Sequence, residues 1–212
     1  MTVGLKICGV TRTEDLVACR ELGVDAVGIN LWSGSRRGLS LAEADLLLRS
    51  TSTDGLERIG VFVDPTAEEV RAAYTTLRLD MVQVVGATYD PLPGIPWMWV
   101  IRGTPELDGL APPSPPDRIL LDAAVPGFGG AGQTTDWGWA RDAVLRLSSI
   151  APVWLAGGIT PDNAAEAIAA VRPTGLDVAS GAEPPGSLRG AKDRGRIAAL
   201  LAACRQSGRS QR

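Results

Sequence analysis

The stretch Val3-Gly4-Leu5-Lys6-Ile7-Cys8-Gly9-Val10-Thr11 decides the fold class of this chain. Its apolar run predicts a strand over residues 3–9, and the helical spacing of the apolar residues that follow predicts a helix over 13–23, with Gly23 as its C-cap. An open, doubly wound sheet would carry a G-x-G-x-x-G sequence after its first strand. Cys8-Gly9-Val10-Thr11 stands there instead, so we expect a closed barrel rather than an open sheet.

The same strand-then-helix pattern repeats along the whole chain. Short runs rich in Val, Ile and Leu predict eight strands near residues 3–9, 25–31, 57–63, 80–85, 97–102, 118–122, 152–156 and 175–179. Helical spacing follows most of them, at residues 13–23, 40–51, 66–77, 136–149, 160–171 and 193–204. We expect Thr160 to cap the helix at 160–171, with Pro161 in its first turn.

Two connections lack a helical pattern, since residues 86–96 and 103–117 are dense in Pro and Gly and predict loops. The apolar runs are too continuous for a sheet with one wet face, so the strands should be parallel and covered on both sides. We therefore predict an α/β fold, a single (β/α)8 TIM barrel over residues 1–205 with an irregular fifth connection. Residues 206–212 should form a disordered tail.

Composition excludes several classes of function. The 212 residues include 21 Lys and Arg against 24 Asp and Glu, a net charge of -3, so we expect no nucleic-acid partner. No apolar run approaches the roughly 18 residues of a membrane span, and the N-terminus lacks a signal-peptide pattern, which predicts a cytoplasmic protein without a membrane partner. The three cysteines are far apart and suggest neither a disulfide nor a zinc site. Histidine is absent, so any catalysis would use carboxylates, a thiol, Lys, Arg or the backbone.

In a (β/α)8 barrel, function gathers at the carboxyl ends of the strands. Lys6 and Cys8 share one face of the first strand, and a nearby ammonium favours the thiolate, which makes Cys8 a candidate base or nucleophile. A buried core cysteine is the alternative. Asp122 ends the sixth strand, where it could act as a general acid with a raised pKa or could cap a loop.

Glycines follow the last three strands of the predicted barrel. Backbone amides after strands seven and eight form a phosphate site in this architecture, and the candidates here are Gly157, Gly158, Ser180 and Gly181. Ordinary tight turns are the alternative. A flexible loop that could fold over a ligand follows strand six, with Gly129, Gly130 and Gly132.

Together these motifs resemble the phosphoribosylanthranilate isomerase family of tryptophan biosynthesis. The resemblance covers nearly the whole chain and rests on Lys6-Ile7-Cys8-Gly9-Val10-Thr11, Gly60-Val61-Phe62-Val63, Leu121-Asp122, residues 129–132 with Asp136-Trp137, residues 155–163, residues 177–183 and Lys192-Asp193. It implies an aldose-ketose isomerase that converts N-(5-phosphoribosyl)anthranilate to 1-(2-carboxyphenylamino)-1-deoxyribulose 5-phosphate by an Amadori rearrangement. It implies no cofactor and no metal. We expect a monomer or a homodimer, and the sequence does not distinguish the two.

The resemblance also implies roles for individual residues. Asp122 would protonate the ribose ring oxygen as general acid, and Cys8 would remove the C2 proton of the resulting Schiff base as general base. Arg37 would bind the anthranilate carboxylate, with Arg36 as the alternative register. The remaining substrate contacts would be made by Lys6, Gln83 and Asp177, and the phosphate would lie on Gly157, Gly158, Ser180 and Gly181.

The chain departs from the family pattern after strands three and four. It reads Gln83-Val84-Val85-Gly86-Ala87-Thr88 where the family usually has Gln-Leu-His-Gly-(Asp or Asn)-Glu, and Asp64, whose role stays open, stands where Asn is usual. In a barrel these positions face the aromatic half of the substrate. Two further hypotheses therefore stay open: a paralogue that isomerises a different phosphorylated sugar amine, and a non-catalytic phosphosugar-binding barrel.

Overall fold

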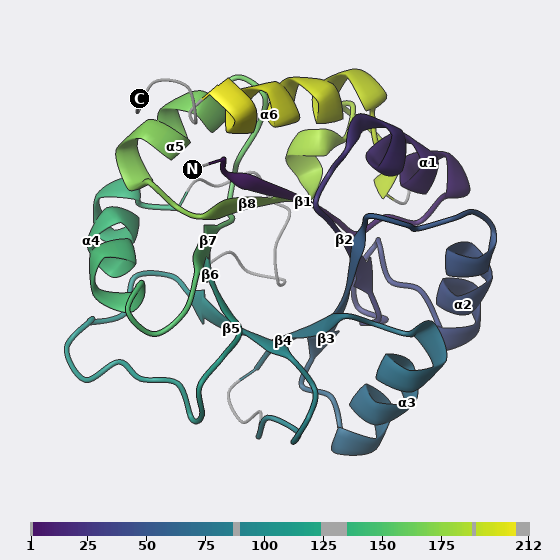
Figure 1. Ribbon diagram of the computed structural model, residues 1–212, viewed down its shortest axis with the longest axis horizontal. Coiled ribbons are helices and arrows are strands. Elements are labelled where there is room, and N and C mark those ends of the chain that lie inside the picture. The colour runs from purple at the N-terminus through teal and green to yellow at the C-terminus, as the bar shows by residue number, and fades with distance from the viewer. Residues whose placement is uncertain (1, 87–89, 124–134, 188–189, 207–212) are drawn as a thin grey trace.

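Eight parallel strands close into one barrel with helices around it (Figure 1). The computed structural model describes residues 2–86, 90–123, 135–187 and 190–206. Each strand pairs with the next along the chain, and the last pairs with the first. The strands are β1 (Gly4–Cys8), β2 (Ala26–Asn30), β3 (Glu57–Val63), β4 (Met81–Val85), β5 (Trp97–Arg102), β6 (Arg118–Asp122), β7 (Val153–Leu155) and β8 (Gly175–Val178). The predicted (β/α)8 barrel is confirmed, and every strand lies within its predicted range.

In the described residues, six α-helices form the outer layer, close to their predicted positions. They are α1 (Thr13–Leu22), α2 (Leu41–Arg49), α3 (Ala67–Leu77), α4 (Trp137–Leu147), α5 (Ala164–Val171) and α6 (Arg194–Gln206), and a 3-10 turn, η1, spans Ser180–Ala182. Gly23 ends α1 in the left-handed conformation, with φ 76° and ψ 44°, as predicted. Capping boxes begin two helices, with Ser40 at α2 and Thr66 at α3, because each side chain accepts the amide of a glutamate three residues on.

The predicted start of α5 is wrong. Thr160 and Pro161 do not begin the helix, because the Asn163 Oδ1 accepts the Thr160 amide at 2.8 Å and its Nδ2 donates to the Gly158 carbonyl at 3.0 Å. These bonds hold residues 160–163 in a turn, and the helix begins at Ala164 with Asn163 as its N-cap.

Both connections predicted to be loops lack a helix in their described residues, 86, 90–96 and 103–117. Figure 1 shows the ring of helices interrupted beside β5. The predicted tail lies outside the described residues except for Gln206, the last residue of α6. None of the helices in the described ranges is long and apolar enough to cross a membrane.

The hydrophobic core has two parts. The larger lies between the strands and the helices. The smaller consists of buried residues from β2 to β7, namely Ala26, Ile59, Met81, Met98, Leu120, Trp154 and the adjoining Ala156. Trp154 requires glycine on β8, since a Cβ on Gly175 would lie 2.3 Å from its indole.

Candidate active site

A buried lysine lies in the interior of the barrel. Lys6 on β1 has no exposed surface. Its Nζ donates to Gln83 Oε1 on β4 at 2.7 Å and to Asp177 Oδ2 on β8 at 2.8 Å. Burial alone would lower the pKa of Lys6, but the charge of Asp177 and the neighbouring Cys8 raise it above its ordinary value, so the ammonium stays charged. The structure thus brings together three of the predicted substrate-binding residues.

Cys8 lies two residues along β1 on the same face and keeps part of its surface exposed. Desolvation raises the pKa of its thiol, the Lys6 ammonium opposes that rise, and the Asp177 carboxylate adds to it. The net result is a thiol whose pKa lies above its ordinary value. Lys6 is therefore the neighbour that most favours the thiolate form of Cys8.

Asp122 ends β6 and is partly exposed at the mouth of the barrel. Burial raises its pKa to about 6, with the charge of Asp177 adding to the rise and Arg102 opposing it. Arg102 ends β5 directly beside Asp122 in the strand register. A carboxyl group that still holds a proton near neutral pH is suited to general-acid work. Arg102 was not predicted as a site residue, although a charged residue at the end of an apolar strand is the same signal that indicated Asp122.

Three of the four predicted phosphate-binding residues line one cavity. It has a volume of about 360 Å³, and Gly158, Ser180 and Gly181 lie in its wall together with Arg36. Among the described residues, none accepts a hydrogen bond from the Gly158 or Ser180 amide. Gly181 must be glycine, because a Cβ there would lie 1.8 Å from the Ile159 carbonyl oxygen. The loops after β7 and β8 therefore pack closely, and residues of both loops line the cavity.

Gly157, the fourth predicted residue, lies away from that wall. Its φ is 85°, and a Cβ there would lie 2.3 Å from Thr135 Oγ1 and 2.8 Å from the Ala123 side chain. Glycine is needed here for chain packing. The predicted loop residues Gly129, Gly130 and Gly132 lie outside the described residues.

Beside the cavity, one buried carboxylate binds three cations. Glu183 accepts hydrogen bonds from Arg37 Nε at 2.6 Å, Arg37 Nη2 at 3.1 Å and Lys192 Nζ at 2.8 Å, and it also pairs with Arg36. Burial would raise the pKa of Glu183, but the hydrogen bonds from Arg37 and the charge of Lys192 hold it below its ordinary value. We call Glu183, Arg36, Arg37 and Lys192 the Glu183 cluster.

Arg36 and Arg37, the two candidates for binding the anthranilate carboxylate, both contact Glu183 but lie in different surroundings. A Cβ on Gly9 would lie 2.4 Å from Arg37 Cδ, so the Arg37 side chain crosses the backbone next to Cys8. Arg36 instead lies in the wall of the cavity lined by Gly158, Ser180 and Gly181. Glu183 and Lys192 belong to the sequence motifs, but their contact could not be predicted from those motifs.

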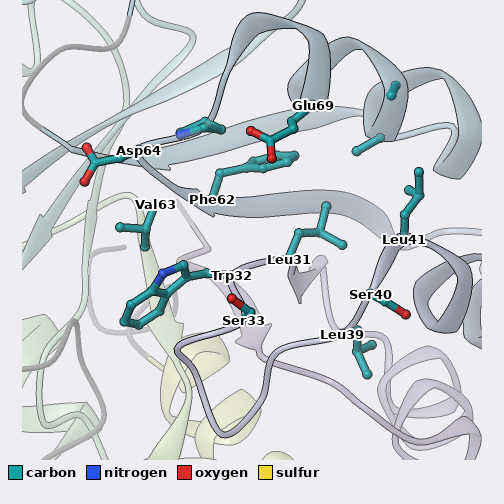
Figure 2. Close-up of a pocket in the computed structure, with 13 residues that line it drawn as sticks. Leu31, Trp32, Ser33, Leu39, Ser40, Leu41, Phe62, Val63, Asp64 and Glu69 are labelled. Carbon is teal, nitrogen blue, oxygen red and sulfur yellow. The ribbon is translucent and has the colours of Figure 1, made fainter.

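A second cavity of about 360 Å³ lies beside β3 and α3 (Figure 2). Its wall includes Trp32, Phe62 and Asp64. Asp64 has a positive φ of 44°, and a Cβ on Gly86 would lie 2.1 Å from Asp64 Oδ1. Figure 2 shows the Asp64 carboxylate directed away from Phe62 and Leu31. Asp64 thus fills the space that Gly86 leaves at the end of β4, where the sequence departs from the family pattern.

Comparison with known proteins decides the family. The family model for N-(5'phosphoribosyl)anthranilate (PRA) isomerase matches residues 5–203. The chain belongs to this isomerase family. It is 37% identical to the N-(5'-phosphoribosyl)anthranilate isomerase of Myxococcus xanthus, in an alignment that covers 97% of each chain. The resemblance predicted from the sequence motifs is confirmed.

Solved structures of phosphoribosylanthranilate isomerases have the same barrel. The Thermus thermophilus enzyme superposes with a TM-score of 0.78 at 31% identity, covering 99% of this chain and 100% of that one. An isomerase in complex with reduced 1-(o-carboxyphenylamino)-1-deoxyribulose 5-phosphate gives a TM-score of 0.75 at 26% identity, covering 96% and 99%. The predicted isomerase class is confirmed by these relatives.

Proposed function

We propose that Cys8 is the general base and Asp122 the general acid in the reaction of this isomerase. The reaction is that of the family, the Amadori rearrangement of N-(5-phosphoribosyl)anthranilate to 1-(2-carboxyphenylamino)-1-deoxyribulose 5-phosphate in tryptophan biosynthesis. The observation that carries the assignment is the pairing of a carboxyl group of pKa about 6 with a thiol beside a buried ammonium. Asp177 acts electrostatically on both groups, so they flank the same interior.

The proposed steps follow from these positions. Asp122 gives its proton to the ribose ring oxygen as the bond between that oxygen and C1 breaks, and the nitrogen lone pair forms the C1–N double bond of a Schiff base. Cys8 then takes the C2 proton as its thiolate, and the C2–H electrons form the enolamine, which ketonises to the product. At pH 7 about a tenth of Asp122 carries a proton at a pKa of about 6.

Different residues would bind the phosphate, the sugar and the anthranilate group of the substrate. The phosphate would lie on the amides of Gly158, Ser180 and Gly181 in the cavity that they line. Asp177 would accept a hydrogen bond from a hydroxyl group of the sugar, since its Oδ1 is buried and has no hydrogen-bond partner among the described residues. Arg37 would bind the anthranilate carboxylate through its Nη1 edge, because Glu183 occupies Nε and Nη2.

Other predicted properties stay predictions. Direct substrate contact by Lys6 and Gln83 is one, and their burial favours an action through Cys8 instead. A cytoplasmic location and a monomeric or homodimeric state are the others. Light scattering of the purified chain would measure the mass and distinguish one chain from two.

The test is turnover of freshly generated N-(5-phosphoribosyl)anthranilate, followed by the loss of its fluorescence. Cys8→Ser and Asp122→Asn should each lower kcat/KM by about a hundredfold or more, the usual cost of losing a general acid or base. Asp142→Asn, on the exposed side of α4, is the control and should match the wild type. A Cys8→Ser or Asp122→Asn variant within about threefold of the wild type would contradict its assigned role.

A wild type that binds a ribulose phosphate analogue without turning over this substrate would have a different meaning. It would favour the hypothesis that the changes after β3 and β4, including Asp64 and Val85, have altered the aromatic half of the site.

A further inference from the structure

The Lys6 ammonium is held by two oxygens of different charge. An ammonium has three N–H donors. One is used by the neutral amide of Gln83 and one by the carboxylate of Asp177, at 2.7 Å and 2.8 Å. The Cys8 thiol is the third group that acts on Lys6, through its charge. The three partners come from β4, β8 and β1, so the ammonium lies at a fixed point in the interior.

Gly28 on β2 shows how closely the ammonium stem and the thiol lie. A Cβ on Gly28 would be 2.8 Å from Cys8 Sγ and 3.1 Å from Lys6 Cε. Both side chains therefore pack against the same glycine, and neither can move toward β2. The position of the ammonium relative to the thiol is then set by the two oxygens that hold it from the other side.

The charged groups acting on the Cys8 thiol are Lys6, Asp177 and Lys192. The two cations favour the thiolate and the carboxylate disfavours it. Gln83 anchors Lys6 without bringing a second negative charge into this group. A carboxylate in its place would make a second anion bind the same ammonium and would weaken the support that Lys6 gives to the thiolate.

We propose that Gln83 is a positioning residue that holds the Lys6 ammonium against Cys8 and so sets the reactivity of the thiol. Gln83 is itself 6% exposed and bonds to Lys6 across the barrel. The inference rests on the proposed role of Cys8 as the base. Its natural readout is the chemistry of the thiol, which can be measured without turnover.

The experiment measures the rate at which iodoacetamide alkylates Cys8 as a function of pH, with the modified residue identified by mass spectrometry. Cys19 and Cys204 are buried, and burial raises the pKa of each to about 12, so they react far more slowly. In Gln83→Glu the inflection should move upward by about one pH unit or more. Alkylation at a fixed pH below the inflection should then be about tenfold slower.

Two further variants complete the design. Gln206→Glu makes the same chemical change at the exposed end of α6 and should leave the inflection unchanged. Gln83→Met keeps the length of the side chain and removes the amide, and should slow alkylation severalfold while lowering kcat with KM within about twofold. Gln83→Met also carries the test if Gln83→Glu fails to fold by circular dichroism.

Unchanged alkylation in the folded Gln83 variants would overturn the proposal. A raised KM with unchanged kcat and alkylation would also overturn it and would show that Gln83 contacts the substrate. These outcomes differ from a failure of the proposed role of Cys8, in which Cys8→Ser would turn over the substrate within about threefold of the wild type although alkylation of Cys8 still responded to Gln83→Glu.

Discussion

Replacing Glu183 by glutamine should destabilise the folded chain strongly. The Glu183 side chain is 2% exposed and binds Arg37 and Lys192, which are also buried. Removing one partner of a buried ion pair costs about 3–5 kcal/mol, because the other charge stays buried without compensation. Glutamine keeps the volume and one acceptor oxygen, so we expect the lower end, about 3 kcal/mol. For a chain of this length that lowers Tm by about 6–12 °C.

Arg36 provides the control within the same cluster. Its side chain is 48% exposed, so its pairing with Glu183 should contribute only about 0–1 kcal/mol. Arg36→Gln should therefore unfold close to the wild type. The contrast separates the effect of two buried cations from a general loss of charge on this face.

The assay is urea unfolding followed by tryptophan fluorescence at several pH values. The pKa of Glu183 is lower in the folded chain than its unfolded value of about 4.3, so its stabilisation is fully present above that pH and is lost as the pH falls through the folded pKa. The gap between wild type and Glu183→Gln should be constant near neutrality and shrink below about pH 4.3. Equal unfolding midpoints at pH 7 would refute the reasoning.

Three other predictions concern activity and packing. Between about pH 6 and the pKa of Cys8, the protonated fraction of Asp122 falls as the thiolate fraction of Cys8 rises, so kcat/KM of the wild type should not change with pH. In Asp122→Asn only the thiolate titrates, so the residual kcat/KM should rise about tenfold per pH unit. A residual kcat/KM of Asp122→Asn that does not change with pH would contradict this. Gly28→Ala places a Cβ 2.8 Å from Cys8 Sγ and should lower kcat at least about tenfold, measured by steady-state kinetics. Gly175→Ala collides with Trp154 and should cost about 1–3 kcal/mol in urea unfolding without changing the pH profile.

The fold could be predicted because its signals are local. Each strand of the barrel is a short apolar run, and Gly23 ends α1 through a conformation that glycine adopts easily. The start of α5 could not be predicted in this way. Thr160 and Pro161 have the residue types of a helix start, but the Asn163 side chain bonds back to Thr160 and delays the helix.

The positions of candidate site residues could be predicted only where one residue stands at the end of a strand. Cys8 and Asp122 stand at the ends of apolar strands, so their positions in the barrel follow from strand order alone. The bond between Lys6 and Gln83 joins residues 77 positions apart, and Glu183 meets Arg37 across 146 positions. No local pattern encodes such contacts, because they depend on how the closed barrel places the side chains.

The seam between β8 and β1 has a consequence for synthesis of the chain. Lys6 on β1 and Asp177 on β8 lie opposite each other where these two strands pair. β1 is synthesised before β8, so Lys6 has no Asp177 carboxylate beside it until β8 has been made. A nascent or truncated chain that lacks β8 has a lysine with no carboxylate to accompany it into the interior, and burying it unpaired costs several kcal/mol. Incomplete chains should therefore stay open and protease-sensitive rather than collapse into an inactive barrel. The ion pair thus favours closure of the barrel only after β8 has been synthesised.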